Sequence, residues 1–235
     1  MYGVRHRRGL RADFLAIPPE RHRRPRLGRL VRGVGITRRA VLSALPPVAL
    51  ITLSPVALQW GRSGGALIGT PVPSGPTPPL ALSKTDGRPF DLAAEHGRLV
   101  LVYFGYTRCP DVCPTTLADL ASALAHLSSE EATRVRVAFV SLDPTADPAP
   151  ALQGYLGSFG PSPPFVGLTG SPAAVARAAA AWDVTWRKAE GGFFDHSSFV
   201  TAVDPGGIRR LRYGYAQTQD PVALAHDLSV LLHDA

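Results

Sequence analysis

Sulfur-containing residues are nearly absent from this chain. Its 235 residues include two cysteines and one methionine. The methionine is Met1, which excludes a thioether ligand from the rest of the chain. Two cysteines and scattered histidines also fit poorly with a structural zinc site, which requires four ligands. Sulfur chemistry is therefore confined to the one segment that holds both cysteines.

Acidic residues are scarce at the beginning of the chain. Residues 1–39 hold 12 arginines against Asp13 and Glu20, whereas residues 40–235 hold 13 basic and 16 acidic residues. The formal net charge of +7 therefore belongs to the N-terminal head. The remainder lacks the clustered Lys and Arg, interleaved with aromatic residues, that nucleic-acid binding requires. We expect no nucleic-acid partner.

Charge is missing altogether from the 21 residues at 40–60. An apolar run of this length behind a basic flank predicts a transmembrane anchor or an export signal, and its prolines are better tolerated in a membrane than in a water-exposed helix. Because the basic flank stays in the cytoplasm, the rest of the chain should lie on the outer side of a bacterial cell membrane, anchored by a single pass. We therefore assign 1–39 to a basic cytoplasmic tail or signal n-region and 40–60 to the anchor or signal.

The next segment is rich in residues that prevent regular structure. Ten of the nineteen residues at 61–79 are Gly or Pro, which predicts a flexible linker. Residues 80–235 are long enough to form one domain with a sizeable core.

Within that domain, buried-strand patterns alternate with helical patterns. The run LVLVYF at 99–104 predicts a strand buried on both faces of a mainly parallel sheet. We predict further strands at 135–142, 197–204 and 208–215, the last two as a hairpin, and helices at 114–127, 150–159, 171–182 and 220–233. This order is typical of an α/β thioredoxin-like three-layer fold with a central mixed sheet.

Both cysteines lie between the first strand and its helix, in the segment FGYTRCPDVCP at 104–114. Cys109 and Cys113 could hold a soft metal, cycle as a disulfide, or do both. Pro114 disfavours helical geometry at Cys113, which predicts that Cys113 lies near the N-cap rather than inside the helix. Helix amides and the helix dipole favour thiolate there, and one intervening turn would place the two α-carbons about 6 Å apart, suitable for either role.

The spacing separates these roles only in part. Dithiol oxidoreductases typically have two residues between their cysteines, whereas three intervene here. Copper(I) is soft, accepts few ligands and favours thiolates, with imidazole as a suitable third donor.

The segment 104–114, together with SLDP at 141–144, DHS at 195–197 and DPG at 204–206, resembles the Sco/SenC family in order and spacing. The resemblance covers about 80–232. It implies a membrane-tethered, thioredoxin-like copper-binding domain at 80–235 that takes part in assembling the copper centre of cytochrome c oxidase. The partner would be the copper-accepting subunit of that oxidase, while the copper donor and the thiol reductant are not indicated.

By this resemblance, the metal ligands are Cys109, Cys113 and His196. They would hold one copper ion, as copper(I), with copper(II) left open. The cysteines must be reduced to bind copper, so the same pair could also form a redox disulfide. Asp111 and Asp195 are candidates for residues that orient the ligands without binding the metal themselves. The expected role is a metallochaperone rather than an enzyme, with a membrane-tethered thiol–disulfide oxidoreductase as the alternative.

Overall fold

The computed structural model describes residues 65–73, 75–160 and 164–234. The predicted basic tail and the apolar run at 40–60 lie outside these ranges. Across the described ranges, no helix has both the length and the apolar character needed to cross a membrane.

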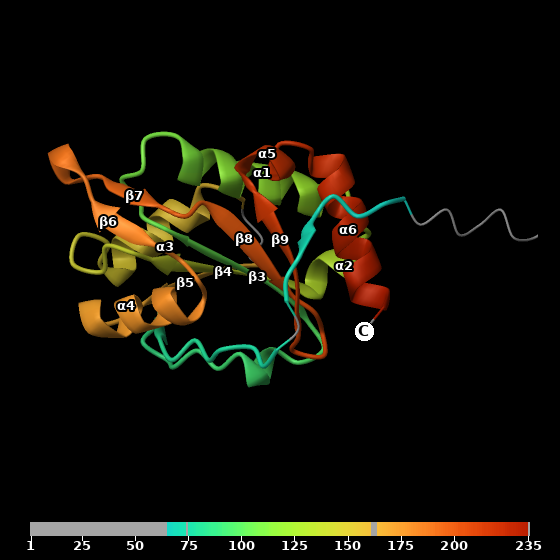
Figure 1. Ribbon diagram of the computed structural model, residues 1–235, viewed down its shortest axis with the longest axis horizontal. Helices are drawn as coiled ribbons and strands as arrows, with labels where there is room; N and C mark the ends of the chain where they lie inside the picture. Colours follow the sequence, from blue (N-terminus) through green and yellow to red (C-terminus); the bar gives the residue numbers. More distant parts are fainter. Residues whose placement is uncertain (1–64, 74, 161–163, 235) are drawn as a thin grey trace, which may run out of the picture. The chain divides into compact units, whose positions relative to one another are not determined.

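Seven strands form one mixed sheet, in the order β1-β9-β8-β3-β4-β5-β2 (Figure 1). They are β1 (Thr70–Pro71), β2 (Ser83–Lys84), β3 (Leu99–Gly105), β4 (Val135–Ser141), β5 (Phe165–Thr169), β8 (Phe199–Val203) and β9 (Arg209–Gly214). β3, β4 and β5 are parallel, whereas the other pairs are antiparallel. The predicted central mixed sheet and its C-terminal hairpin are thus confirmed.

Helices cover both faces of the sheet. They are α1 (Val112–Ala125), α2 (Ser129–Thr133), α3 (Ala149–Gly157), α4 (Pro172–Ala181), α5 (Tyr215–Thr218) and α6 (Pro221–His233), with short 3-10 turns at Ala93–Glu95 and Glu190–Gly192. Apolar side chains of α1, α3 and α6 pack in one core cluster, and those of α4 pack in the other. Every residue of β3 is buried, as expected for a strand between two helical layers. The three-layer α/β arrangement follows.

Several elements are additional to those predicted from the sequence. β5 is short, contains Gly167 and is only partly buried, so its pattern is weak. A separate two-stranded sheet is formed by β6 (Trp186–Lys188) and β7 (Phe194–His196). Strands of three residues are too short to show a period, so this hairpin was not predicted.

Part of the predicted linker, from Ile68 to Val72, is bound to the domain rather than free. β1 pairs with β9, and the buried Asp227 carboxylate accepts hydrogen bonds from the Ile68 and Gly69 amides at 3.2 and 2.9 Å. Gly69 permits this approach because a Cβ there would lie 2.8 Å from the Tyr213 ring. The linker prediction was therefore wrong for this part. The backbone amides of a free tether would hydrogen-bond to water, whereas here the Asp227 carboxylate on α6 accepts their hydrogen bonds.

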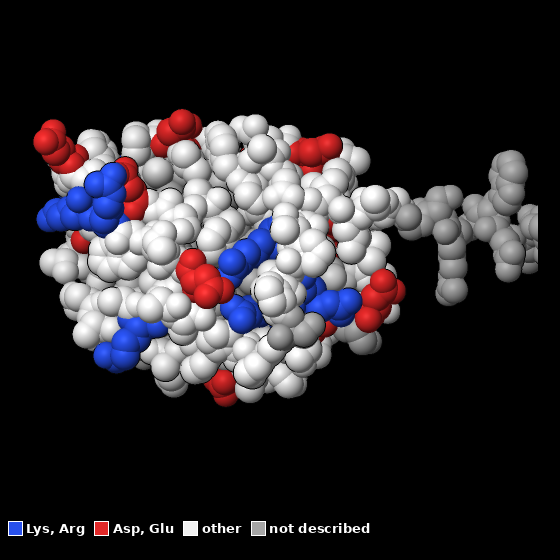
Figure 2. All heavy atoms as spheres, viewed as in Figure 1, with Lys and Arg blue, Asp and Glu red and all other residues white. Residues whose placement is uncertain are grey.

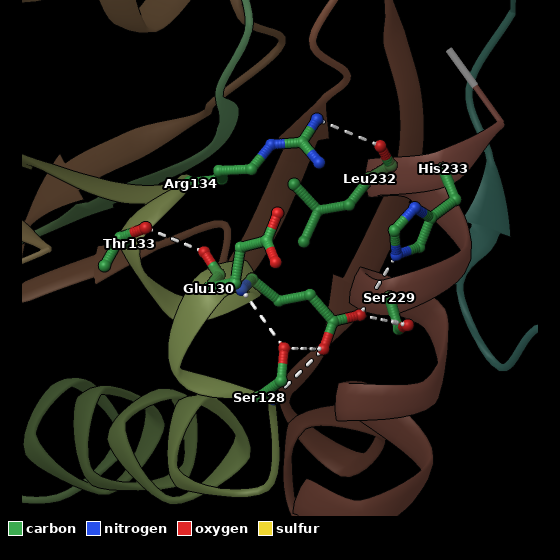
Figure 3. Close-up of polar contacts among 8 residues, drawn as sticks. Ser128, Glu130, Thr133, Arg134, Ser229, Leu232 and His233 are labelled. Atoms are coloured by element: carbon green, nitrogen blue, oxygen red, sulfur yellow. Dashed lines mark hydrogen bonds and ion pairs between the residues drawn. The ribbon is translucent and has the colours of Figure 1, made fainter.

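Glu131 joins α2 to the end of α6. Its carboxylate accepts hydrogen bonds from the Ser128 hydroxyl at 2.6 Å and the Ser229 hydroxyl at 2.5 Å, and lies 3.3 Å from His233 Nε2. Figure 3 shows Ser128 on one side of this cluster and Ser229 and His233 of α6 on the other. The hydrogen bonds from Ser128 and then Ser229 lower the pKa of Glu131 from its usual 4.5 to about 2. The carboxylate thus caps α2 and holds the C-terminal helix against it.

We expect Glu131→Gln to destabilise the fold in a pH-dependent way. Because the pKa is lower in the folded state, the stabilisation from the charged carboxylate is complete above pH 4.5 and is lost as the pH falls towards 2. Denaturant unfolding of wild type and variant should therefore differ at neutral pH and converge in acid. Glu130→Gln, on the same helix, is the control and should show no such convergence; a Glu131→Gln difference independent of pH would contradict the prediction.

Most of the surface that Figure 2 shows is uncharged, and several of its basic groups lie beside acidic ones. On β9, Arg212 pairs with Asp183 at 2.5 Å and Arg210 with Asp204 at 2.9 Å. These arginines are therefore partly neutralised by their neighbours.

Candidate metal centre

The two cysteines lie where β3 passes into α1. Asp111 is the N-cap residue, so Cys113 is the second residue of the helix, and its amide lies 3.4 Å from Cys109 Sγ. Cys113 thus lies near the N-cap, as predicted, but inside the first turn of the helix rather than before it. Pro114 is tolerated in the first turn because no amide hydrogen bond is needed there, and the helix begins before it.

The β6–β7 hairpin brings His196 to this turn. Its Nε2 lies 3.6 Å from Cys113 Sγ, although the two residues are 83 positions apart. Its Nδ1 lies 3.0 Å from the Ser197 carbonyl oxygen. Since a carbonyl oxygen can only accept, this contact favours a proton on Nδ1, and in that tautomer of the neutral imidazole the Nε2 lone pair faces the sulfur. This is the tautomer that a metal-binding imidazole needs.

Both cysteines are free thiols. Cys113 is fully buried, whereas Cys109 is partly exposed. The Cys113 thiol, and to a lesser extent His196 and the Asp111 and Cys113 amides, lower the pKa of Cys109 to about 3. The adjacent Cys109 sulfur and then burial raise the pKa of Cys113. The two cysteines therefore carry one negative charge between them, which resides mainly on Cys109.

The three predicted ligands are neighbours but do not yet enclose a common point. In the part of the chain that the structure describes, no three or more His, Cys, Asp or Glu side chains form a closed metal site. Cys113 contacts both Cys109, through its amide, and His196, through its sulfur. The two sulfurs and the imidazole nitrogen thus come from residues that are in contact with one another.

Neither aspartate proposed as a support contacts His196. Asp195 points away from the cysteines and pairs with Arg187 at 2.6 Å, because alternate residues of β7 face opposite sides. The Ser197 carbonyl takes the orienting role suggested for Asp195. Asp111 is exposed, and its amide rather than its carboxylate acts on Cys109.

Asp147 supports the cysteine loop and was not identified from the sequence. Its fully buried carboxylate accepts hydrogen bonds from the Thr107 amide at 3.0 Å, the Thr107 hydroxyl at 2.5 Å and the Ser141 hydroxyl at 2.7 Å. It thereby ties the loop two residues before Cys109 to the end of β4. No local pattern marks this role, because Asp147 and Thr107 are 40 residues apart.

We expect Asp147→Asn to destabilise the fold by about 1–3 kcal/mol, because the buried hydrogen bonds to a charged carboxylate would be replaced by weaker ones to a neutral amide. Denaturant unfolding measures this loss. Asp143→Asn is the matched control in the same loop. It breaks an ion pair with Arg108, whose side chain is 55% exposed, and should cost less than about 1 kcal/mol. Equal losses in the two variants would contradict the proposed support by Asp147.

The SCO1/SenC family model matches residues 75–232. Among solved structures, apo Sco1 from Thermus thermophilus is 36% identical with a TM-score of 0.63, covering 71% of this chain and 99% of that one. Copper-bound ScoI from Bradyrhizobium japonicum is 30% identical with a TM-score of 0.58, covering 66% and 98%.

Curated relatives give the same result. The mitochondrial SCO1 homolog 1 of Arabidopsis thaliana is 31% identical over 160 residues, which is 66% of this chain and 45% of that protein. The chain spans about half the length of the first curated relatives it matches. The family match, the fold and the arrangement of the cysteine turn together place this chain in the SCO1/SenC family.

Proposed function

We propose that this chain is a copper chaperone that holds one copper ion through Cys109, Cys113 and His196. The observation that carries the proposal is the approach of His196 Nε2 to within 3.6 Å of Cys113 Sγ, with Nδ1 turned to the Ser197 carbonyl oxygen. Two thiolates and an imidazole form a donor set that suits copper(I). Copper is bound in the related ScoI structure from Bradyrhizobium japonicum, which supports this choice of metal.

The proposed delivery target is the copper-accepting subunit of cytochrome c oxidase, as the family resemblance implies. Copper would pass by exchange of ligands, with no covalent step on the protein. We further propose that 40–60 anchors the chain in a bacterial cell membrane and that the domain works on the outer side. The basic flank and the uncharged run support this topology.

Copper(I) titration of the reduced full-length chain tests the ligand set. The chain should retain close to one equivalent of copper. His196→Ala should lower the copper affinity by about 10-fold or more, since removing even a residue that only supports a ligand typically lowers metal affinity by about 10–100-fold. His126→Ala, at the exposed end of α1, is the control and should bind like wild type. Retention unchanged in His196→Ala would remove the histidine from the proposed site.

A thiol–disulfide oxidoreductase is the second candidate, favoured by the lowered pKa of Cys109 beside a second free thiol. Reduction of a peptide disulfide discriminates between the two. If the enzyme function dominates, activity is lost in Cys109→Ser and kept in His196→Ala. If the chaperone function dominates, peptide reduction is negligible in wild type.

A further inference from the structure

The strand that carries His196 is only lightly attached to the domain. β6 and β7 pair with each other and, within the described residues, with no strand of the main sheet. Figure 1 shows this hairpin projecting past the ends of the strands of the main sheet. Gly191 and Gly192, in its turn, have φ angles of 71° and 80°, which glycine adopts without strain. Besides the packing of Trp186 and Phe194 against the core, contacts from β7 to the cysteine turn position His196.

Tyr106 supplies those contacts from within the cysteine loop. It is 2% exposed and lies three residues before Cys109. Its hydroxyl oxygen accepts a hydrogen bond from the Phe194 amide at 3.3 Å. Its ring packs edge-on against Phe194 and His196, with centroid distances of 5.2 and 5.9 Å. Because Phe194 and His196 are two apart on β7, they face the same side, and Tyr106 fills the space beside both.

We propose that the Tyr106 hydroxyl is a latch that holds the His196 strand closed over the cysteines and so slows copper release. This inference rests on the proposed copper function. Tyr106 is a positioning residue in it: it is not itself a ligand, and it acts on the metal through the residues that it contacts, chiefly Phe194 and His196 of β7.

Opening of the site has a defined first step in this arrangement. For His196 to move away from Cys113, β7 must lift from the loop, and the Phe194 amide must exchange the Tyr106 oxygen for water. Ring packing alone would let β7 slide, because an aromatic edge contact is weakly directional, whereas an amide–hydroxyl bond fixes the strand along its length. The same bond links the cysteine loop and the histidine strand, so both halves of the site would open and close together.

Tyr106→Phe tests the latch because it removes the acceptor oxygen and keeps the ring. Hydrogen exchange is measured at Phe194 in the metal-free full-length chain, labelled with nitrogen-15 at its nine phenylalanines. Exchange at Phe194 should become roughly 2- to 10-fold faster, the change that loss of one hydrogen bond produces. Tyr155→Phe is the matched control: among the described residues its hydroxyl has no hydrogen-bond partner, so Phe194 exchange should be unchanged.

The second readout is the rate at which copper(I) passes to an excess of a chelating dye. Tyr106→Phe should release copper faster by a similar factor, with the X-ray absorption signature of two sulfurs and one nitrogen unchanged. Unchanged Phe194 exchange overturns the latch, and so does faster exchange with an unaltered release rate. If wild type fails to hold copper, the proposed function is wrong, and the proposed control of copper release is wrong with it. The Phe194 exchange rates then report only on the attachment of the hairpin.

Discussion

Iodoacetamide is expected to modify Cys109 at least about 100-fold faster than Cys113 in the reduced, metal-free chain at neutral pH. Cys109 is partly exposed, and its pKa of about 3 makes it a thiolate. Cys113 is fully buried and its pKa is raised, so it presents neither access nor a thiolate. A thiolate of low pKa is intrinsically less nucleophilic, which lowers the absolute rate at Cys109 but does not reverse the order. Mass spectrometry of modified peptides measures both rates.

The pH dependence separates the causes of this reactivity. With a pKa near 3, the rate at Cys109 should stay flat from about pH 5 to 8, whereas an ordinary thiol would accelerate towards its pKa of about 8.5. Cys113→Ala removes the hydrogen bond that lowers the Cys109 pKa most, so the rate should then rise with pH over this range. Equal modification of both cysteines in wild type would contradict the arrangement of the pair.

Gly105→Ala is expected to destabilise the fold by about 1–3 kcal/mol, the usual cost of inserting a methyl group into a packed core. A Cβ at this position would lie 2.8 Å from the Phe139 ring and 2.9 Å from Cys113 Sγ. One of these neighbours must move, and movement of the sulfur would separate it from His196. Copper(I) retention should therefore fall along with the free energy of unfolding, and denaturant unfolding and copper titration measure the two effects.

Gly154→Ala provides the matched control on α3. No atom of the residues that the structure describes lies within 4 Å of a Cβ at this helical position. Alanine is favoured over glycine in helices by up to about 1 kcal/mol, so the same substitution should stabilise the fold here. A loss of stability at both glycines would mean that the crowding at Gly105 is not the cause.

The core of the fold could be predicted because its signals are local. The apolar run of β3 and the spacing of Leu117, Leu120 and Leu124 on α1 mark a buried strand and an amphipathic helix within a few residues. Shorter elements carry too few residues to show a period, which is why β5 and the β6–β7 hairpin were missed. The bound part of the linker was missed for another reason: Asp227, which holds it, is 158 residues from Gly69.

By itself, the sequence determined the α/β class, the cysteine turn at the start of a helix and, through family resemblance, the three proposed ligands. The tertiary structure decided how those ligands are held. In the folded chain the Ser197 carbonyl, rather than Asp195, orients His196, and Asp147 anchors the cysteine loop. Tyr106, which belongs to that loop, contacts β7. The physical reason is that a helix or strand follows from neighbours along the chain. The approach of an imidazole to a thiol, the burial of a carboxylate and the space beside Gly105 depend instead on segments that meet only when the sheet has formed.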